Sequence, residues 1–98
     1  MKNPIDKLNK SFESRVRLGI MSILMVNERV DFNTLKDTLE VTDGNLASHL
    51  TAIEKEGFIN VRKSFLGRKP HTSYAVTRYG ARSFKEHLNA LELLLKKR

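Results

Sequence analysis

Residues 39–59 read LEVTDGNLASHLTAIEKEGFI, and this stretch decides the fold. Three apolar residues recur at the spacing i, i+4 and i+7 of one helix face: Leu46, Leu50 and Ile53. Thr42 or Asp43 is expected to cap the start of this helix, and Gly57 suits the left-handed position just after its end. The stretch therefore predicts a helix with one buried face and one polar face.

The pattern changes immediately downstream, from a period of about 3.6 to a period of 2. Residues 58–65 and 72–76 are rich in β-branched and aromatic residues and predict two strands. Residues 67–71, GRKPH, contain two structure breakers and predict the turn between them. These segments predict a β-hairpin with a cationic tip, and Thr77 is expected to cap a last helix that runs to the C-terminus.

Upstream of the quoted stretch, five apolar residues recur at helical spacing: Phe12, Val16, Ile20, Ile23 and Leu24. They predict a first helix that Ser11 caps and that ends near Asn27. Residues 30–32 alternate like a short strand, and Asn33 is expected to cap a short second helix. The predicted order is α-β-α-α-β-β-α, a mainly α fold with a small β-hairpin (α+β).

Two separated motifs resemble the winged helix-turn-helix regulators of the MarR and ArsR families. The first is the His49-Leu50 pair followed by IEKEGFI at residues 53–59, and the second is YAVTRYG at residues 74–80. A subgroup with a TDGNL run and a GRKP wing is the most similar. The resemblance covers nearly the whole chain from Phe12. It implies that residues 1–98 form one winged-helix domain that binds double-stranded DNA as a homodimer and regulates transcription, commonly as a repressor.

In this resemblance, the helix within residues 42–56 is the recognition helix. A helix in the major groove needs short side chains for close approach and polar groups that read base edges. The candidate DNA-contacting residues here are Thr42, Asp43, Gly44, Asn45, Ser48, His49 and Thr51. Glycine inside a helix costs about 1 kcal/mol relative to alanine. Close passage against a phosphate would explain Gly44, as would an irregular helix start.

Three of these residues also have structural explanations. Asn45 would bond an adenine edge or satisfy the helix start. Asp43 is favoured by the helix dipole, and phosphate would repel it unless it accepts from a cytosine amine. His49 would either contact DNA or pack half-buried against the second helix.

Basic charge is concentrated after residue 60. Residues 1–60 hold eight Lys or Arg against nine Asp or Glu, a net charge of −1, whereas residues 61–98 hold ten against two, a net charge of +8. This asymmetry favours a polyanionic partner, with solubility as the simpler explanation. The candidate DNA-contacting residues of the wing are Arg62, Lys63, Arg68, Lys69 and His71. The alternative is a solvated loop.

The last helix carries a heptad seam. Five residues have the spacing 3, 4, 3, 4: Ala81, Phe84, Leu88, Leu91 and Leu95. Residues 77–98 are therefore expected to form a dimerisation helix, with Phe84, Leu88, Leu91 and Leu95 at the interface. A twofold dimer would place two recognition helices on a palindromic operator. The alternative is packing of the seam on the first helix of the same chain.

Other functions lack support in the sequence. There is no cysteine, and the three histidines are not at metal-ligand spacing, so we expect no metal, no cofactor and no enzyme activity. No signal peptide or membrane-spanning stretch is evident, so a cytoplasmic protein without membrane contact is expected. A small-molecule effector is not indicated, although a pocket between the core and the dimer helices would allow one.

The residue pattern also bears on two further classes of partner. RNA binding would need exposed aromatic side chains on the hairpin, where Phe58, Phe65 and Tyr74 are better explained by packing in the core. A winged helix that serves as a protein-interaction scaffold would carry bulky apolar or acidic residues on the outer face of the recognition helix. That face is polar in this sequence.

Overall fold

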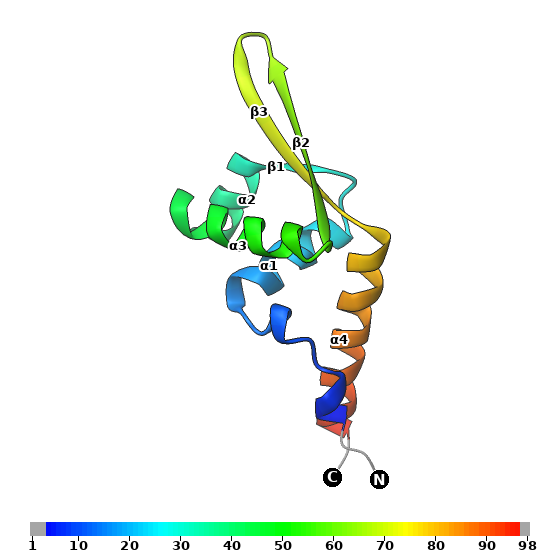
Figure 1. Ribbon diagram of the computed structural model, residues 1–98. Coiled ribbons are helices and arrows are strands. Elements are labelled where there is room, and N and C mark those ends of the chain that lie inside the picture. The colour runs from blue at the N-terminus through cyan, green and yellow to red at the C-terminus, as the bar shows by residue number, and fades with distance from the viewer. Residues whose placement is uncertain (1–3, 97–98) are drawn as a thin grey trace.

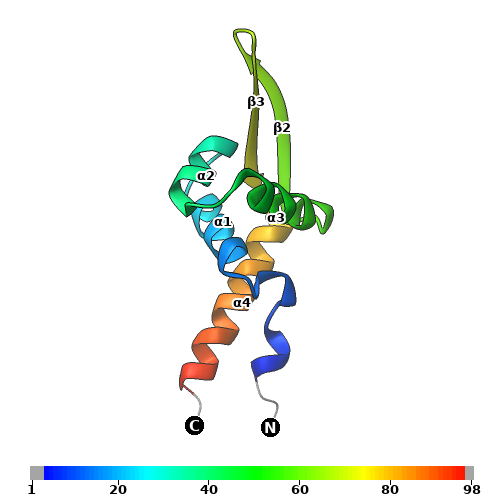
Figure 2. The same ribbon diagram turned by 90° about the vertical axis from the view of Figure 1, so that its left-hand side faces the viewer.

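A computed structural model of the protein describes residues 4–96. Its elements are η1 (Pro4–Lys7), η2 (Lys10–Phe12), α1 (Arg15–Met25), β1 (Val30–Asp31), α2 (Phe32–Leu39), α3 (Asp43–Lys55), β2 (Ile59–Leu66), β3 (Lys69–Val76) and α4 (Arg78–Lys96). The predicted order of helices and strands is confirmed, and the two 3₁₀ turns precede it. The hairpin of β2 and β3 projects from one end of the helical body, and α4 extends toward the other (Figures 1 and 2).

The core lies between α1, α2, α3 and the base of the sheet, and Phe12 is fully buried in it. Its ring centroid lies 4.8 Å from that of Phe58 and 5.2 Å from that of Phe84. Phe12 belongs to η2, so the prediction that the first helix starts after a Ser11 cap is wrong. Helix α1 starts at Arg15, where the Ser14 hydroxyl accepts a hydrogen bond from the Arg17 N–H.

The caps of the next two helices differ in how well the sequence predicted them. Asp31, and not Asn33, caps α2 by accepting from the Thr34 N–H at 2.9 Å. Of the two predicted candidates for α3, Thr42 and not Asp43 is the cap, because its hydroxyl accepts from the Asn45 N–H at 3.1 Å. Gly57 follows α3 with a φ of 85°, a left-handed conformation that favours glycine, which confirms its predicted position.

The sheet has the order β1-β3-β2, and both pairings are antiparallel. The turn between β2 and β3 contains only Gly67 and Arg68, so residues 69–71, predicted as turn, belong to β3. Gly67 has a φ of 64°, and a positive φ at the first of two turn residues is typical of a type II′ turn. The hairpin is therefore longer than predicted, and Phe65 near its tip is exposed rather than packed in the core.

Proline in a central strand requires an explanation, and the short β1 provides it. β1 pairs only with Ser73 and Tyr74, so the edge of β3 is open at Pro70. Pro70 stands opposite Phe65, one pair beyond the Leu66–Lys69 pair that closes the turn. Backbone hydrogen bonds alternate between successive pairs, so the nitrogen of Pro70 points to this open edge, where no N–H is needed.

Helix α4 packs beside the N-terminal segment and buries Gly80, Phe84, His87 and Ala90. Phe84 was expected at a partner surface, but it lies in the chain's own core. The helix has a period of about 3.6 residues and a heptad seam a period of about 3.5, so the row of buried residues and the seam diverge along α4 and share this residue. The predicted seam residues Leu88, Leu91 and Leu95 are exposed, so they do not pack on the first helix. Residues 97–98 of the predicted dimerisation helix lie outside the described residues.

One buried histidine joins α4 to the N-terminal segment. His87 Nδ1 accepts a hydrogen bond from the Asn9 N–H at 2.9 Å, and the ring packs against Phe12. Burial lowers the pKa of His87, so its neutral form is the one that fits this position. The side chain thus fixes the segment before α1 against the last helix.

The junction of the hairpin with α4 is tightly constrained. The Thr77 hydroxyl donates to the carbonyl oxygens of Gly57 and Phe58 and accepts from the Gly80 N–H at 2.8 Å, which confirms Thr77 as the cap of α4. A Cβ atom at Gly80 would lie 2.7 Å from the Phe58 carbonyl carbon and would overlap its oxygen. The first turn of α4 can approach the Phe58 backbone only because residue 80 has no side chain.

We therefore expect Gly80→Ala to lower the free energy of unfolding by about 3 kcal/mol, because the added methyl group meets backbone rather than a flexible side chain. Urea denaturation of both proteins measures this change. Gly44→Ala is the matched control, since nothing in the described residues lies within 4 Å of a Cβ atom there. Equal stability of the parent and Gly80→Ala would contradict the close approach.

Candidate DNA interface

Helix α3 presents a face of short polar residues to solvent. Six of the seven predicted contact residues on this segment are exposed: Thr42, Asp43, Gly44, Asn45, Ser48 and Thr51. The opposite face is fixed in the core by Leu46, Leu50 and Ile53. The helix is therefore held from behind, while its outer face is free of bulky side chains and can approach another surface closely.

The start of α3 shows which polar groups remain free to bind. The helix start is capped by Thr42, and the Asn45 side chain has no hydrogen-bond partner within residues 4–96. Asp43 forms an ion pair with Lys36 at 2.9 Å, and this hydrogen bond raises the pKa of Lys36. Asn45 therefore keeps its amide for a ligand, whereas Asp43 links α3 to α2.

The half-buried His49 contacts α1 rather than the predicted second helix. Its Nδ1 accepts a hydrogen bond from Arg17 Nε at 2.9 Å. Burial and the Arg17 charge lower the pKa of His49. An uncharged imidazole that accepts at Nδ1 carries its proton on Nε2, which makes Nε2 a donor. Sequence patterning did not single out Arg17, because helical spacing does not show which side chain of α1 reaches α3.

The hairpin has two faces with different surroundings. Lys63 lies on the face that carries the partly buried Val61, opposite Thr72 in the register, and this face turns toward α3. Arg62, Lys69 and His71 lie on the other face, and Arg68 is in the turn. The structure thus brings Lys63 close to α3. Arg68 lies at the tip of the hairpin, and the other predicted basic residues lie on the face that turns away from α3.

A further basic residue, Arg29, supports that second face. Its guanidinium donates to the Ser73 carbonyl oxygen at 3.2 Å and to the Asn60 side chain. Burial, followed by the nearby Arg62 charge, lowers the pKa of Arg29. The sequence signal was weak, because a single Arg before a two-residue strand has no distinguishing pattern.

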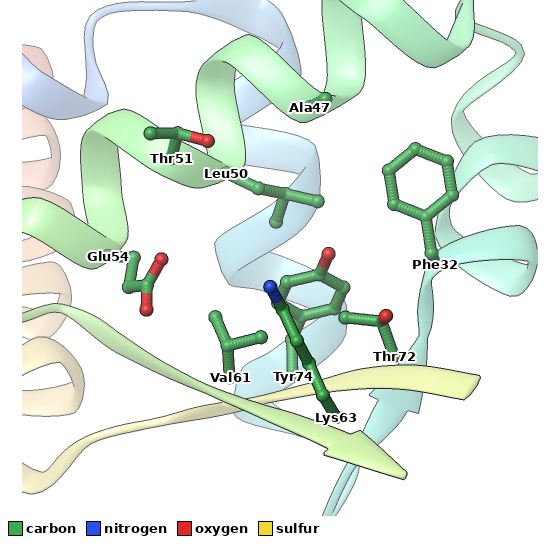
Figure 3. Close-up of a pocket in the computed structure, with 9 residues that line it drawn as sticks. All are labelled: Phe32, Ala47, Leu50, Thr51, Glu54, Val61, Lys63, Thr72 and Tyr74. Carbon is green, nitrogen blue, oxygen red and sulfur yellow. The ribbon is translucent and has the colours of Figure 1, made fainter. Parts of the chain in front are cut away.

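A cleft of about 330 Å³ separates α3 from the hairpin. Figure 3 shows side chains of both elements directed into it. Its lining residues are Phe32, Ala47, Leu50, Thr51, Glu54, Val61, Lys63, Thr72 and Tyr74. The ammonium group of Lys63 is the cationic group of this lining, and the Glu54 carboxylate is the anionic one. The cleft is open at the surface where α3 and the hairpin meet.

Comparison with known proteins assigns this arrangement to a family. The model of the winged helix DNA-binding domain matches residues 16–95. The chain belongs to this family. By their positions in this fold, α3 is called the recognition helix and the hairpin is called the wing. The family consists of DNA-binding domains and not of enzymes.

Individual relatives agree with this assignment. The uncharacterized protein MJ0432 of Methanocaldococcus jannaschii is 38% identical over 79 residues, which are 81% of this chain and 86% of that protein. A transcriptional regulator homologue from Pyrococcus horikoshii OT3 is 28% identical, with a TM-score of 0.88 over 98% of this chain and 96% of that one. The structure of ytfH from Salmonella typhimurium is also 28% identical, with a TM-score of 0.71 over 89% of this chain and 78% of that one. The winged helix domain thus has the fold of transcriptional regulators.

Residues 4–96 lack two other classes of feature. No helix among residues 4–96 combines the length and the apolar character that crossing a membrane requires. Within the same residues, no three His, Asp or Glu side chains gather closely enough to hold a metal ion.

Gly44 allows a direct test of the recognition helix, because no atom of residues 4–96 lies close enough to a Cβ atom there to require a glycine. Gly44→Ala should leave the free energy of unfolding within about 1 kcal/mol of the parent, as expected for such a change in a helix. Duplex affinity should fall about tenfold, because the methyl group would lie between the helix and a phosphate. Denaturation and fluorescence anisotropy measure the two effects. Unchanged affinity would instead assign Gly44 to an irregular helix start.

Proposed function

We propose that this winged helix domain is a sequence-specific transcriptional regulator that binds a palindromic operator as a homodimer and acts as a repressor. The observation that carries the proposal is the pairing of two surfaces: a recognition helix with an exposed face of short polar side chains and a wing with cations beside it. The first fits the major groove and the second fits the adjacent phosphates or minor groove.

The recognition helix would supply the base reading. Asn45 has a free amide that can bond an adenine edge in a bidentate manner, and Ser48 and Thr51 offer hydroxyl groups. His49 would donate from Nε2 to a phosphate while Arg17 holds its other nitrogen. The polar outer face of α3 favours DNA over the protein-interaction scaffold.

The wing would supply the charge-dependent part of the affinity. Residues 59–76, which form the wing, hold four Lys or Arg residues and no Asp or Glu. Phosphate contacts of this kind release counterions and do not depend on sequence. The cleft between α3 and the wing lies where the backbone separating two grooves would pass, with Lys63 directed into it.

The dimer would form through α4. Leu88, Leu91 and Leu95 are 42%, 37% and 83% exposed, and they lie at heptad spacing on a helix that extends from the body. The same three leucines of a second copy would cover them. Twofold symmetry then matches a palindromic site, and occupancy of that site excludes other proteins, which is sufficient for repression.

The DNA surface can be tested with two variants whose effects differ in kind. Arg68→Ala with Lys69→Ala should weaken binding to all duplexes and reduce the slope of log affinity against log salt by about 2. Asn45→Ala should relax the preference at one base pair by about 1–3 kcal/mol and leave the salt slope unchanged. Anisotropy titrations with a duplex selected from a random pool measure both.

Lys7→Ala with Lys10→Ala is the matched control, because it removes two exposed cations from the N-terminal 3₁₀ turns. This control should bind like the parent apart from a small change in long-range attraction. If the wing variant and Asn45→Ala both bind as the parent does, the proposed surface is wrong.

The dimer surface is tested by Leu88→Glu, which places a charge in the exposed stripe. We expect monomers at concentrations where the parent is dimeric, because the interface would bury an unpaired carboxylate. Size-exclusion chromatography with light scattering measures the mass. Asn89→Glu adds the same charge at an exposed neighbouring position and should remain dimeric. A monomeric parent at these concentrations would contradict the proposal.

A further inference from the structure

The tip of the wing exposes two large apolar side chains. Phe65 is 70% exposed and Leu66 is 64% exposed, although both belong to a regular strand. The apolar packing of the hairpin ends near its base, where Ile59 and Tyr74 are buried. Exposed apolar side chains on a projecting hairpin bury no surface within this chain, and such patches mark sites of interaction with a partner.

The two residues lie on opposite faces of the hairpin. Successive side chains of a strand alternate, so Phe65 shares its face with Lys63 and Val61, the face that turns toward α3. Its cross-strand neighbour on that face is Pro70. Leu66 lies on the other face, opposite Lys69. Phe65 and Pro70 therefore form an apolar pair on the side of the wing where the recognition helix lies.

Cations lie near this pair on both faces of the hairpin tip. Lys63 is two residues before Phe65, and Arg68 and Lys69 occupy the turn and the first position of β3. An apolar tip with positive charge beside it complements a surface that is anionic outside and apolar inside. The minor groove has this character, since phosphates line its walls and stacked bases form its floor.

We propose that Phe65, supported by Pro70, is an apolar wedge that enters the minor groove beside the recognition site and partly unstacks one base step. Phenylalanine and proline are among the side chains that proteins insert in this way, and the duplex bends as a result. The inference rests on the proposed function and adds a deformation step to it. Flexible pyrimidine–purine steps would be favoured at this position, without any hydrogen bond to a base.

A basic and apolar tip would also suit an anionic membrane surface. The position of Phe65 favours DNA, because its face of the hairpin continues into the cleft against α3. A membrane contact would require no such alignment with a recognition helix. Binding to anionic vesicles is the competing outcome of the experiment.

The test is Phe65→Thr, which removes the apolar ring and keeps a residue suited to strands. The duplex is one selected from a random pool, with 2-aminopurine at successive positions of the flank that the wing would reach and a dye pair at its ends. We expect affinity to fall about tenfold, a loss typical of a stacked aromatic contact. The salt slope should not change, because no cation is lost. The rise in 2-aminopurine fluorescence and the bend measured by energy transfer should disappear.

Two further variants make the test specific. Leu66→Thr alters the adjacent, similarly exposed residue on the other face, and it should keep affinity within about twofold and preserve the bend. Phe65→Leu keeps an apolar wedge and should retain most of the bend. A thermal unfolding midpoint equal to that of the parent would show that each variant is folded.

Several results would overturn the wedge. The wedge would be excluded if Phe65→Thr bound and bent the duplex as the parent does. It would also be excluded if Leu66→Thr lost as much affinity and bending as Phe65→Thr. The same holds if Phe65→Thr affects only sedimentation with vesicles of phosphatidylglycerol and phosphatidylcholine. A parent that binds no duplex at low salt would instead refute the proposed function itself.

Discussion

The junction around the Phe58 carbonyl is the constraint on which the rest of the structure depends. Its oxygen accepts from the Thr77 N–H at 3.0 Å and from the Thr77 hydroxyl at 3.1 Å. The chain enters the hairpin just after residue 58 and leaves it just before residue 77, so these bonds close the base of the wing. The same residues follow the end of α3 and precede α4. One backbone group therefore relates three parts of the molecule: the recognition helix, the wing and the last helix.

Side-chain contacts then fix the recognition helix on its remaining sides. Lys36 holds its first turn through Asp43, and Arg17 holds its middle through His49. Near its end, the Ser11 hydroxyl bonds the Glu56 carboxylate. These contacts use the flanks of α3 and leave the outer face unoccupied. Such preorganisation lowers the ordering cost of binding, because the helix does not need to be positioned when a duplex arrives.

The sequence was sufficient for the order of elements and for the capping of α3 and α4, since period and turn chemistry act locally. It failed where a distant contact competes with a local signal. Phe12 fits the periodicity of α1, but it lies in a 3₁₀ turn where it reaches Phe58 and Phe84. Phe84 fits the heptad seam equally well, and its burial depends on where the N-terminal segment packs. Phe65 looked like a core residue because the alternation of a strand does not show where its partner surface ends.

The same distinction between local signals and distant contacts applies to the candidate DNA-contacting surface. Its composition and its two segments could be recognised in advance, because short polar residues and clustered cations are visible in the sequence. The distribution of the wing cations over two faces depends on the hairpin register, and the register depends on a turn two residues long. The Arg17–His49 and Arg29–Ser73 contacts join segments 32 and 44 residues apart, a separation that no local pattern encodes.

The proline in β3 also has a consequence for how the protein behaves in a crowded solution. Beyond the two residues that β1 covers, β3 offers an unpaired backbone edge beside exposed apolar side chains. Such an edge is a template for strand addition between molecules. Pro70 removes a donor from it, and the neighbouring Lys69 adds repulsion between copies. The hairpin can thus remain long and apolar at its tip without joining its neighbours into fibres.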